Sequence, residues 1–352
     1  MIYDIAVIGL GPAGASFARL VDSQKYKVIA FDKKDACFPD RYAKPCGGLL
    51  SPDALRALSR FGLPIPGEVI ASPQIFYVKT IDMDRGLTRN YSRFYLNIDR
   101  QKFDHWLVSL IPQSVTVYGG STVTGIRKTG DAYEVNYRHD GLEYTITAKY
   151  VVGADGARSI VSKTFVDPGR KNQLLSIQEW FSYDSQNAFF SCVFDRQNSG
   201  SYSWSLSKNG YFIFGGAYDI HRARDTFEQQ KAKLIPYGVN LPEPVRREAC
   251  FVKRLRSVRD IRLGAEEVLL LGEAAGFISP SSFEGISGAL NSAYQLSRVF
   301  NAGRTDILRG YRKAAWKMRL KYTLKIFKAS VLCNRFLRGL IMKSGIKSIR
   351  LV

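Results

Sequence analysis

IYDIAVIGLGPAG, residues 2–14, is the stretch of this 352-residue chain that decides the fold. A short apolar run stops at Gly9, and Gly9, Gly11 and Gly14 then fit the pattern G-x-G-x-x-G. Gly9 permits a tight strand-to-helix turn, Gly11 lets the backbone approach a pyrophosphate, and Gly14 lets the helix pack closely on the strand. The N-terminus of such a helix presents free N–H groups and partial positive charge to phosphates. The stretch therefore predicts a dinucleotide site.

A second predicted strand, KVIAFD, ends in Asp32, 18 residues after Gly14. A carboxylate at about this separation is placed to bind the ribose of the nucleotide. The strand before the glycines, the helix after them and the acid beyond make this fingerprint more specific than three glycines alone. We predict an α/β fold with a Rossmann-type nucleotide-binding core.

The fingerprint begins so early that we expect no signal peptide ahead of it and a cytoplasmic protein. No run approaches the roughly 20 apolar residues that span a bilayer. The five cysteines are scattered without a C-x-x-C pair, and the three histidines are equally dispersed. This pattern argues against a zinc site, a disulfide framework or a catalytic triad, so no metal is expected.

Basic charge is concentrated near the C-terminus. The net charge is +20, and residues 308–352 hold 13 of the 51 Lys and Arg residues and no acid. Leu320, Leu324, Phe327 and Val331 recur at helical spacing beside a stripe of lysines. Three interpretations compete: a helix packed on the body with a solvated basic flank, a basic amphipathic helix on an anionic membrane surface, and a nucleic-acid contact. No nucleic-acid-binding signature supports the third, so no nucleic acid is expected.

The middle of the chain changes character. From about 170 to 260, aromatic residues alternate with period two, which predicts an antiparallel sheet inserted into the α/β scaffold. Strands are expected over 74–98, and helices from Ser51-Pro52, from Arg100 and near Phe283. The predicted division is a discontinuous nucleotide-binding domain (1–72, 93–168 and 262–305), a substrate domain (73–92 and 169–261) and a basic helical segment (306–352).

Two more motifs follow the fingerprint. KYVVGADGARS, residues 149–159, reads as strand, turn and helix start, and LLLGEAAG, residues 269–276, as strand and turn. With the fingerprint they resemble the three FAD-binding motifs, the second and third known as DG and GD, of flavoproteins with a glutathione-reductase-like fold. KPCGGLLSP, residues 44–52, is similar to the cysteine–glycine loop of geranylgeranyl reductases, and YSWSLSK, residues 202–208, to their Y-x-W-x-F-P-K motif. The overall run looks most like the bacterial CbrA-type branch of that family.

The resemblance implies FAD as the cofactor and, by position in the motifs, the residues that would hold it. Arg100 would lie near the cofactor phosphates, and the backbone from Gly285 to Gly288 near the pyrimidine edge of the flavin. Glu273 stands where the GD motif has Asp, which puts its hydrogen bond to the ribitol in doubt. The full implied set is Gly9, Gly11, Pro12, Ala13, Gly14, Asp32, Lys33, Lys44, Cys46, Gly47, Arg100, Asp155, Gly156, Gly272, Glu273, Gly285 and Ile286.

The resemblance also implies a substrate pocket lined by Tyr202, Trp204 and Lys208, whereas Leu206 and Ser207 depart from the family motif. We expect Lys208 either to bind a phosphate on a prenyl substrate or to be a solvated, exposed lysine. The Cys46 thiol, on a loop expected beside the flavin, is either a proton donor or a space filler.

The implied reaction is reduction of a C=C bond in a lipophilic, isoprenoid-type substrate by hydride transfer from reduced flavin. The electrons would come from NAD(P)H or a reduced ferredoxin-like carrier, although there is no second G-x-G-x-x-G. One alternative is a flavin monooxygenase that hydroxylates a small aromatic. Another is a non-catalytic flavin-binding protein held peripherally at a membrane by its basic segment. A halogenase is disfavoured because its W-x-W-x-I-P motif is only partly matched by YSWSLS.

Overall fold

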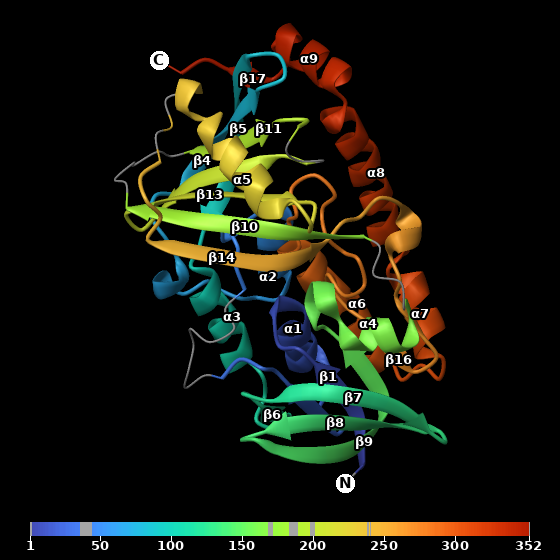
Figure 1. Cartoon of the computed structure of the whole chain (residues 1–352). Helices are drawn as coiled ribbons and strands as arrows, with labels where there is room; N and C mark the ends of the chain where they lie inside the picture. The colour runs from blue at the N-terminus through green and yellow to red at the C-terminus, as the bar shows by residue number, and fades with distance from the viewer. Residues whose placement is uncertain are drawn as a thin grey trace.

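Two β-sheets organise the chain in the computed structural model, which describes residues 2–35, 44–167, 172–182, 189–197, 201–237, 239 and 241–351. The first sheet lies near the N-terminus and the second toward the C-terminus, with α8 running beside the second sheet (Figure 1). The strands of the first sheet are β1 (Ile2–Ile8), β2 (Val28–Phe31), β6 (Thr116–Tyr118), β7 (Thr122–Thr129), β8 (Ala132–His139), β9 (Leu142–Gly153), β15 (Gly264–Ala265) and β16 (Val268–Leu270).

The first sheet has a parallel core in the order β16–β9–β1–β2–β6. The residues of β2 and β16 are all buried, as expected for strands covered on both faces. A hairpin of β7 and β8 continues the sheet by pairing antiparallel with the first part of β9. The parallel pairing brings the carboxyl ends of β16, β9, β1 and β2 to one edge of the sheet.

Helices cover this core. α1 (Pro12–Leu20) packs along α6 (Ile286–Asn301), so segments nearly 300 residues apart in sequence lie side by side. α2 (Pro52–Arg60) begins where predicted, because Ser51 caps it by accepting a hydrogen bond from the Ala54 N–H. The remaining helices of this part are α3 (Arg100–Ser109) and α4 (Ile160–Phe165).

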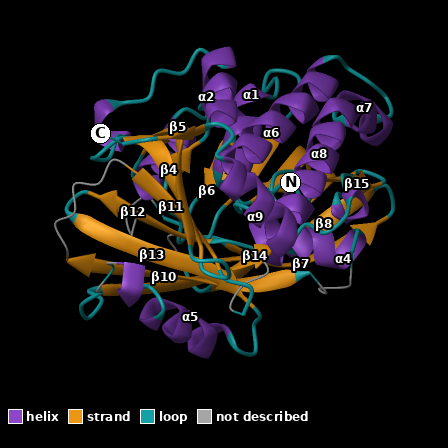
Figure 2. Cartoon of the chain, turned by 90° about the horizontal axis from the view of Figure 1, so that it is seen from above, coloured by secondary structure: helices purple, strands orange, loops and turns teal. Residues whose placement is uncertain are grey.

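The second sheet is mostly antiparallel and runs in the order β14–β10–β13–β12–β11–β4–β5–β17. α5 (Ala223–Ala232) covers its outer face over β10 and β13 (Figure 2). The opposite face carries the aromatic cluster described below. The strands of the second sheet are β3 (Leu49–Leu50), which pairs with β5, and β4 (Ile75–Asp82), β5 (Leu87–Asn97), β10 (Gln173–Ser182), β11 (Phe189–Phe194), β12 (Ser203–Lys208), β13 (Tyr211–Tyr218), β14 (Arg246–Lys253) and β17 (Ser348–Ile349).

Two predicted boundaries differ from the structure. The domain boundary expected at residue 92 falls inside β5, which continues to Asn97. The helix expected near Phe283 begins only at Ile286, because Phe283 has a left-handed φ of 51°. Glu284 then accepts hydrogen bonds from both the N–H and the hydroxyl of Ser287, which satisfies a donor of the first turn.

The basic C-terminal segment forms three helices, α7 (Ile307–Ala314), α8 (Trp316–Cys333) and α9 (Arg335–Ser344). α8 packs on the body through Tyr322 and Ala329, which are buried. The predicted stripe is not the packing face, because Leu320, Leu324 and Phe327 lie in solvent. None of the helices within the described residues is both long and apolar enough to cross a bilayer.

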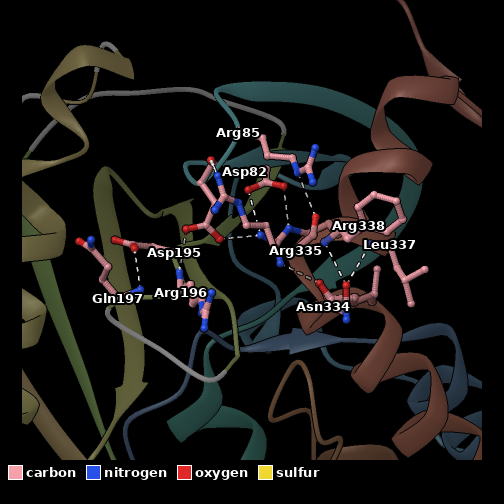
Figure 3. A network of polar contacts seen from close by, with 12 residues as sticks. Asp82, Arg85, Asp195, Arg196, Gln197, Asn334, Arg335, Leu337 and Arg338 are labelled. Carbon is pink, nitrogen blue, oxygen red and sulfur yellow. Dashed lines mark hydrogen bonds and ion pairs between the residues drawn. The ribbon is translucent and has the colours of Figure 1, made fainter.

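Arg338 fastens α9 to the second sheet (Figure 3). Its guanidinium donates to both carboxylate oxygens of Asp82, at 2.8 and 2.9 Å, and to Asp84 at 2.8 Å. The Arg338 and Asp82 side chains are 4% and 0% exposed. Bidentate geometry makes this pair strong, and its burial makes the loss of either partner costly.

We expect Arg338→Met to lower the free energy of unfolding by about 3–5 kcal/mol, because Asp82 would remain as a buried charge without a partner. Urea denaturation of the full chain measures this loss. Removing both charges, with Asp82→Leu added, recovers part of it. Arg127→Met, which breaks an exposed pair with Glu134, serves as the control and leaves the midpoint unchanged. A single Arg338→Met variant as stable as the parent contradicts the assignment.

Candidate functional site

Four of the predicted motifs lie next to one another along the carboxyl edge of the first sheet. β16 leads into Gly272-Glu273, β9 into Asp155-Gly156, β1 into the glycine turn, and β2 into Asp32. The sheet order β16–β9–β1–β2 sets their sequence along the edge. In open α/β sheets, ligands bind at this edge, so the fold brings together residues spread over most of the chain.

The glycine turn between β1 and α1 has the shape of a phosphate cradle. Gly9 has a φ of 93°, and a Cβ there would lie 2.8 Å from the Ala154 carbonyl oxygen. A Cβ on Gly14 would lie 1.8 Å from the Gly9 carbonyl oxygen. By contrast, a Cβ on Gly11 would meet nothing within 4 Å. Two glycines therefore serve packing, and the third borders open space at the helix N-terminus.

The start of α1 offers donors to that space. Gly11 is its N-cap, and no side chain caps the helix. Pro12 stands at the first helical position, and Ala13 and Gly14 follow it in the first turn. Uncapped N–H groups and the positive end of the helix dipole suit a pyrophosphate.

Asp32 stands at the end of β2 beside the glycine turn. Its carboxylate accepts hydrogen bonds from the Leu10 N–H at 2.5 Å and the Lys34 N–H at 2.8 Å. Each oxygen thereby uses one acceptor site and keeps another for a ribose hydroxyl. Lys33, the next residue, is exposed.

A buried charge cluster supports this end of the site. Asp104 accepts from Arg100 Nε at 2.7 Å and from Lys34 Nζ at 2.8 Å. Burial opposes ionisation of Asp104, but the Arg100 and Lys34 charges outweigh it and hold the pKa of this carboxyl below its usual range. Asp104 therefore holds the Arg100 side chain along α3. Burial opposes the charge of Arg100, but Asp104 and, after it, Cys46 outweigh this and raise the Arg100 pKa.

The turn after β9 leaves a polar atom without a protein partner. Asp155 Oδ2 accepts from the Ile160 N–H at 2.7 Å and thereby holds the start of α4. Asp155 Oδ1 is buried and has no hydrogen-bond partner among the described residues. Burial raises the pKa of Asp155 above its usual value. A buried acceptor of this kind calls for a partner that a bound cofactor can provide.

Glu273 is held by two lysines. Its Oε2 accepts from Lys44 Nζ at 2.5 Å, and its Oε1 accepts from the Lys253 backbone N–H at 2.9 Å. Burial opposes protonation of Lys44, but Glu273 outweighs this and raises the Lys44 pKa above its usual value. The longer side chain at 273 thus reaches the KPCGG loop (residues 44–48) and ties it to the turn after β16.

The N-terminus of α6 is only partly open. Gly285 is its N-cap without a side-chain cap, and a Cβ there would have its nearest contact at 3.9 Å. At Gly288, a Cβ would lie 2.4 Å from both the Phe277 carbonyl oxygen and the Tyr322 hydroxyl. The Cβ side of Gly288 is therefore closed, and Gly285 with Ile286 is the part of this turn that has room for a ligand.

The KPCGG loop lies against β12, which carries the YSWSLSK segment. Side chains two apart on a strand share a face, and Trp204 and Leu206 both approach Gly47. Lys208 continues this face and lies next to Gly48, so the structure brings the two sequence motifs together.

Lys208 is buried, so the expectation of an exposed lysine was wrong. Its ammonium donates to the carbonyl oxygens of Gly48 and Ile98 and to Asn97 Oδ1. With these three acceptors in place it has no remaining N–H for a substrate phosphate. Burial lowers the Lys208 pKa to about 8. Its role here is to pin the KPCGG loop to the end of β5.

Above the loop lies an aromatic cluster on the inner face of the second sheet. Tyr202 is buried among Phe190 and Phe194, with ring centroids 6.2 and 5.6 Å away. The Trp204 indole N–H is buried and has no hydrogen-bond partner within the described chain. The side chains that complete this cluster are Leu49, Ile75, Val78, Tyr95, Trp180, Cys192, Leu206, Ile213 and, from α8, Leu332.

The cysteines differ in environment. Cys46 is half-buried, and its Sγ lies 3.4 Å from the Gly48 N–H. Burial raises the pKa of Cys250 to about 11, and its thiol contacts the Pro45 carbonyl oxygen at 3.9 Å. Cys37 lies outside the described residues. Within the described ranges, no group of His, Cys, Asp and Glu is arranged to hold a metal ion.

These features fit an FAD lying along the sheet edge. The open space at Gly11, the uncapped α1 N-terminus and the free acceptor sites of Asp32 suit the ADP half. Asp155 Oδ1 in the DG motif and the Trp204 N–H beside the KPCGG loop are buried without a hydrogen-bond partner among the described residues. They lie where the flavin half of FAD would be held.

Sequence reasoning missed two residues of the site. Asp104 lies four residues after Arg100 on α3, and that i,i+4 spacing of opposite charges was a usable signal. Lys253 comes from β14, and only the pairing of the second sheet brings its N–H to Glu273. No local pattern in the sequence indicates that contact.

Alanine substitutions at Gly11 and Gly14 should have opposite effects on stability and FAD binding. Gly11→Ala should change the free energy of unfolding of the FAD-free protein by less than about 1 kcal/mol, because its Cβ meets nothing. It should weaken FAD binding at least about tenfold, because the Cβ enters the space of the pyrophosphate. Gly14→Ala should destabilise the FAD-free protein itself by about 3 kcal/mol.

Thermal or urea unfolding and a flavin fluorescence titration measure both quantities. Equal FAD affinity in Gly11→Ala and the parent would place the pyrophosphate elsewhere.

Comparison with known proteins agrees with this geometry. Residues 2–313 match the family described as FAD binding domain. "Protein CbrA" of Shigella flexneri is 46% identical over 347 residues, covering 99% of this chain and 94% of that protein. "Protein CbrA" of Escherichia coli K12 is 45% identical, covering 99% and 98%.

Among solved structures, a geranylgeranyl bacteriochlorophyll reductase-like protein from Thermoplasma acidophilum has a TM-score of 0.82 at 18% identity, covering 100% of this chain and 92% of that one. PqsL of Pseudomonas aeruginosa, a probable FAD-dependent monooxygenase, has a TM-score of 0.70 at 16% identity, covering 98% and 99%. These two share the fold with this chain. The full-length sequence match and the FAD-binding domain together show that the chain belongs to the CbrA-type family of FAD-dependent oxidoreductases.

Proposed function

We propose that this protein reduces a C=C bond of a lipophilic, isoprenoid-type substrate, using FAD reduced by NAD(P)H or by a ferredoxin-like carrier. The observation that carries the proposal is the position of the KPCGG loop. It lies between the FAD motifs and the aromatic cluster, joined to the first by Lys44–Glu273 and to the second by Gly47 against Trp204. A substrate in that cluster would therefore have the cofactor and the Cys46 thiol as neighbours.

The aromatic cluster suits an apolar chain better than a charged one. Its side chains are aromatic and aliphatic, and burial raises the pKa of Tyr202 well above its usual value, so this phenol stays neutral. Lys208, which lies at its border, is occupied by protein acceptors. Apolar walls hold an alkene by burial and exclude water from the reaction.

Bound reduced FAD supplies a hydride to one alkene carbon. The other carbon needs a proton, and we assign it to the Cys46 thiol. Arg100 and Lys208 both lie close enough to Cys46 for its charge to act on them. After the thiol has given its proton to the alkene carbon, water returns a proton to Cys46 Sγ and restores the thiol.

The competing reaction on this scaffold is oxygen transfer to a small aromatic. Anaerobic reduction of the FAD-loaded protein, followed by stopped-flow mixing with prenyl lipids or with O₂, separates the two. Reoxidation by the alkene with a saturated product supports the proposal. Reoxidation by O₂ alone, with a hydroxylated aromatic, overturns it, and a protein that takes up no FAD overturns both reactions.

We expect Cys46→Ala to slow alkene-dependent reoxidation by about 10²–10⁴-fold, the usual contribution of a general acid. FAD affinity and the rate of reduction should stay close to those of the parent. Cys250→Ala is the matched control, because that thiol is also half-buried and contacts the Pro45 carbonyl oxygen of the same loop, while its raised pKa keeps it protonated. An unchanged rate in Cys46→Ala would leave the thiol a space filler.

A further inference from the structure

α8 presents an apolar stripe to solvent. The stripe consists of Trp316, Leu320, Leu324 and Phe327, whose side chains are 54%, 52%, 63% and 70% exposed. At 3.6 residues per turn these four positions fall on one side of the helix. Exposed single apolar residues are ordinary, but four large ones in one row on one helix mark an interaction surface.

The opposite side of the same helix is already used. Tyr322 and Ala329 are buried, and Tyr322 packs on Phe277, with ring centroids 5.4 Å apart. Near its end, α8 sends Leu332 into the aromatic cluster. α8 therefore has two apolar sides, one facing the FAD domain and the aromatic cluster and one facing solvent.

Positive charge flanks the stripe. Lys317 and Lys328 lie next to it on the helix surface, and Lys343 and Lys347 follow on and after α9. No ion pair between described residues involves any of these four lysines. Burial lowers the pKa of Lys328, and its neighbours Arg93, Lys325 and Lys347 lower it further. Mutual repulsion thus acts among Arg93 on β5, Lys325 and Lys328 on α8, and Lys347 in the C-terminal turn. An anionic surface would relieve this repulsion.

The next helix continues the surface on a rigid support. α9 exposes Phe336, Leu337, Leu340 and Ile341. Arg338 on the same helix is locked to Asp82 and Asp84 (Figure 3). The exposed apolar residues of α9 are therefore held in a fixed position next to α8, although nothing in the described chain covers them.

We propose that α8 and α9 form an interfacial docking surface that seats the protein on an anionic lipid bilayer. The stripe enters the boundary between headgroups and acyl chains, and the flanking lysines meet lipid phosphates. The same α8 separates this surface from the aromatic cluster, so docking would put that cluster next to the membrane. The docking proposal stands independently of which reaction the pocket supports.

Charge decides between possible occupants of this surface. Residues 308–352 carry 13 Lys and Arg and no acid, so two copies meeting through this face would repel each other. A nucleic acid would neutralise the lysines but would leave the apolar stripe in water. An anionic bilayer satisfies both the charge and the apolar surface.

The test is co-sedimentation of the full-length, FAD-loaded protein with vesicles of phosphatidylcholine alone or mixed with phosphatidylglycerol. We expect binding to the anionic vesicles only, weakened by added salt. The triple variant Leu320→Ser, Leu324→Ser, Phe327→Ser should lower the partition coefficient at least about tenfold, because it removes the inserted side chains. Trp316 fluorescence should shift to the blue on binding, and this shift should be absent in Trp316→Phe.

The matched control is Leu142→Ser, at a position equally exposed but on the β8–β9 hairpin. It should bind as the parent does. Unchanged FAD absorbance and melting temperature show that the triple variant is folded, since all three positions lie in solvent. Equal binding by parent and triple variant overturns the proposal. The proposal is also overturned if the parent does not bind vesicles but self-associates or binds duplex DNA, and the triple variant loses that association.

Discussion

The close packing of α1 against the turn after β1 is the constraint on which the rest of the structure depends. A Cβ on Gly14 would collide with the Gly9 carbonyl oxygen, and one on Gly9 would collide with the backbone at Ala154. These contacts join β1, α1 and the end of β9 at a single point. Because β16 and β2 pair in parallel on either side, the same point aligns the four polar turns at the sheet edge. The cofactor site is thus a consequence of backbone packing, and its polar side chains are added to a frame that Gly9 and Gly14 define.

The second level of organisation is a chain of polar ties between the two sheets. Glu273 joins the turn after β16 to Lys44 and to Lys253 of the second sheet, and Lys208 joins β12 to the KPCGG loop and the end of β5. The Lys208 contacts are buried and therefore costly to break, whereas the Lys44–Glu273 contact is partly exposed on the lysine side. Glu273, at the position where the GD motif has Asp, has a physical account here, since its longer side chain spans the distance to the loop. The outcome is a loop fixed between the FAD motifs and the aromatic cluster.

Whether a feature of the fold or the site could be predicted depends on how far apart in the sequence its interacting residues lie. The fingerprint, the strand ending in Asp32 and the Ser51 cap are local patterns, and the structure confirmed the elements they predict. The burial of Lys208 was not predictable, because it depends on Asn97 and Gly48, which are more than 100 residues away. The orientation of α8 was also out of reach. Periodicity located its apolar stripe correctly but could not tell that Tyr322 and Ala329 form the packing side, since both sides of the helix carry apolar residues.

The two proposals meet at α8, whose inner side borders the aromatic cluster and whose outer side is apolar and cationic. A lipophilic substrate and a membrane-facing helix are consistent with each other, yet each rests on its own residues. The central claim is the reduction of a C=C bond by the FAD-loaded protein, and the most direct measurement is mass spectrometry of a prenyl lipid after anaerobic turnover in D₂O. The account predicts a saturated product with deuterium on two neighbouring carbons, because both added hydrogens come from exchangeable positions. Recovery of unchanged lipid, together with oxygen from O₂ in an aromatic product once air is admitted, would contradict it.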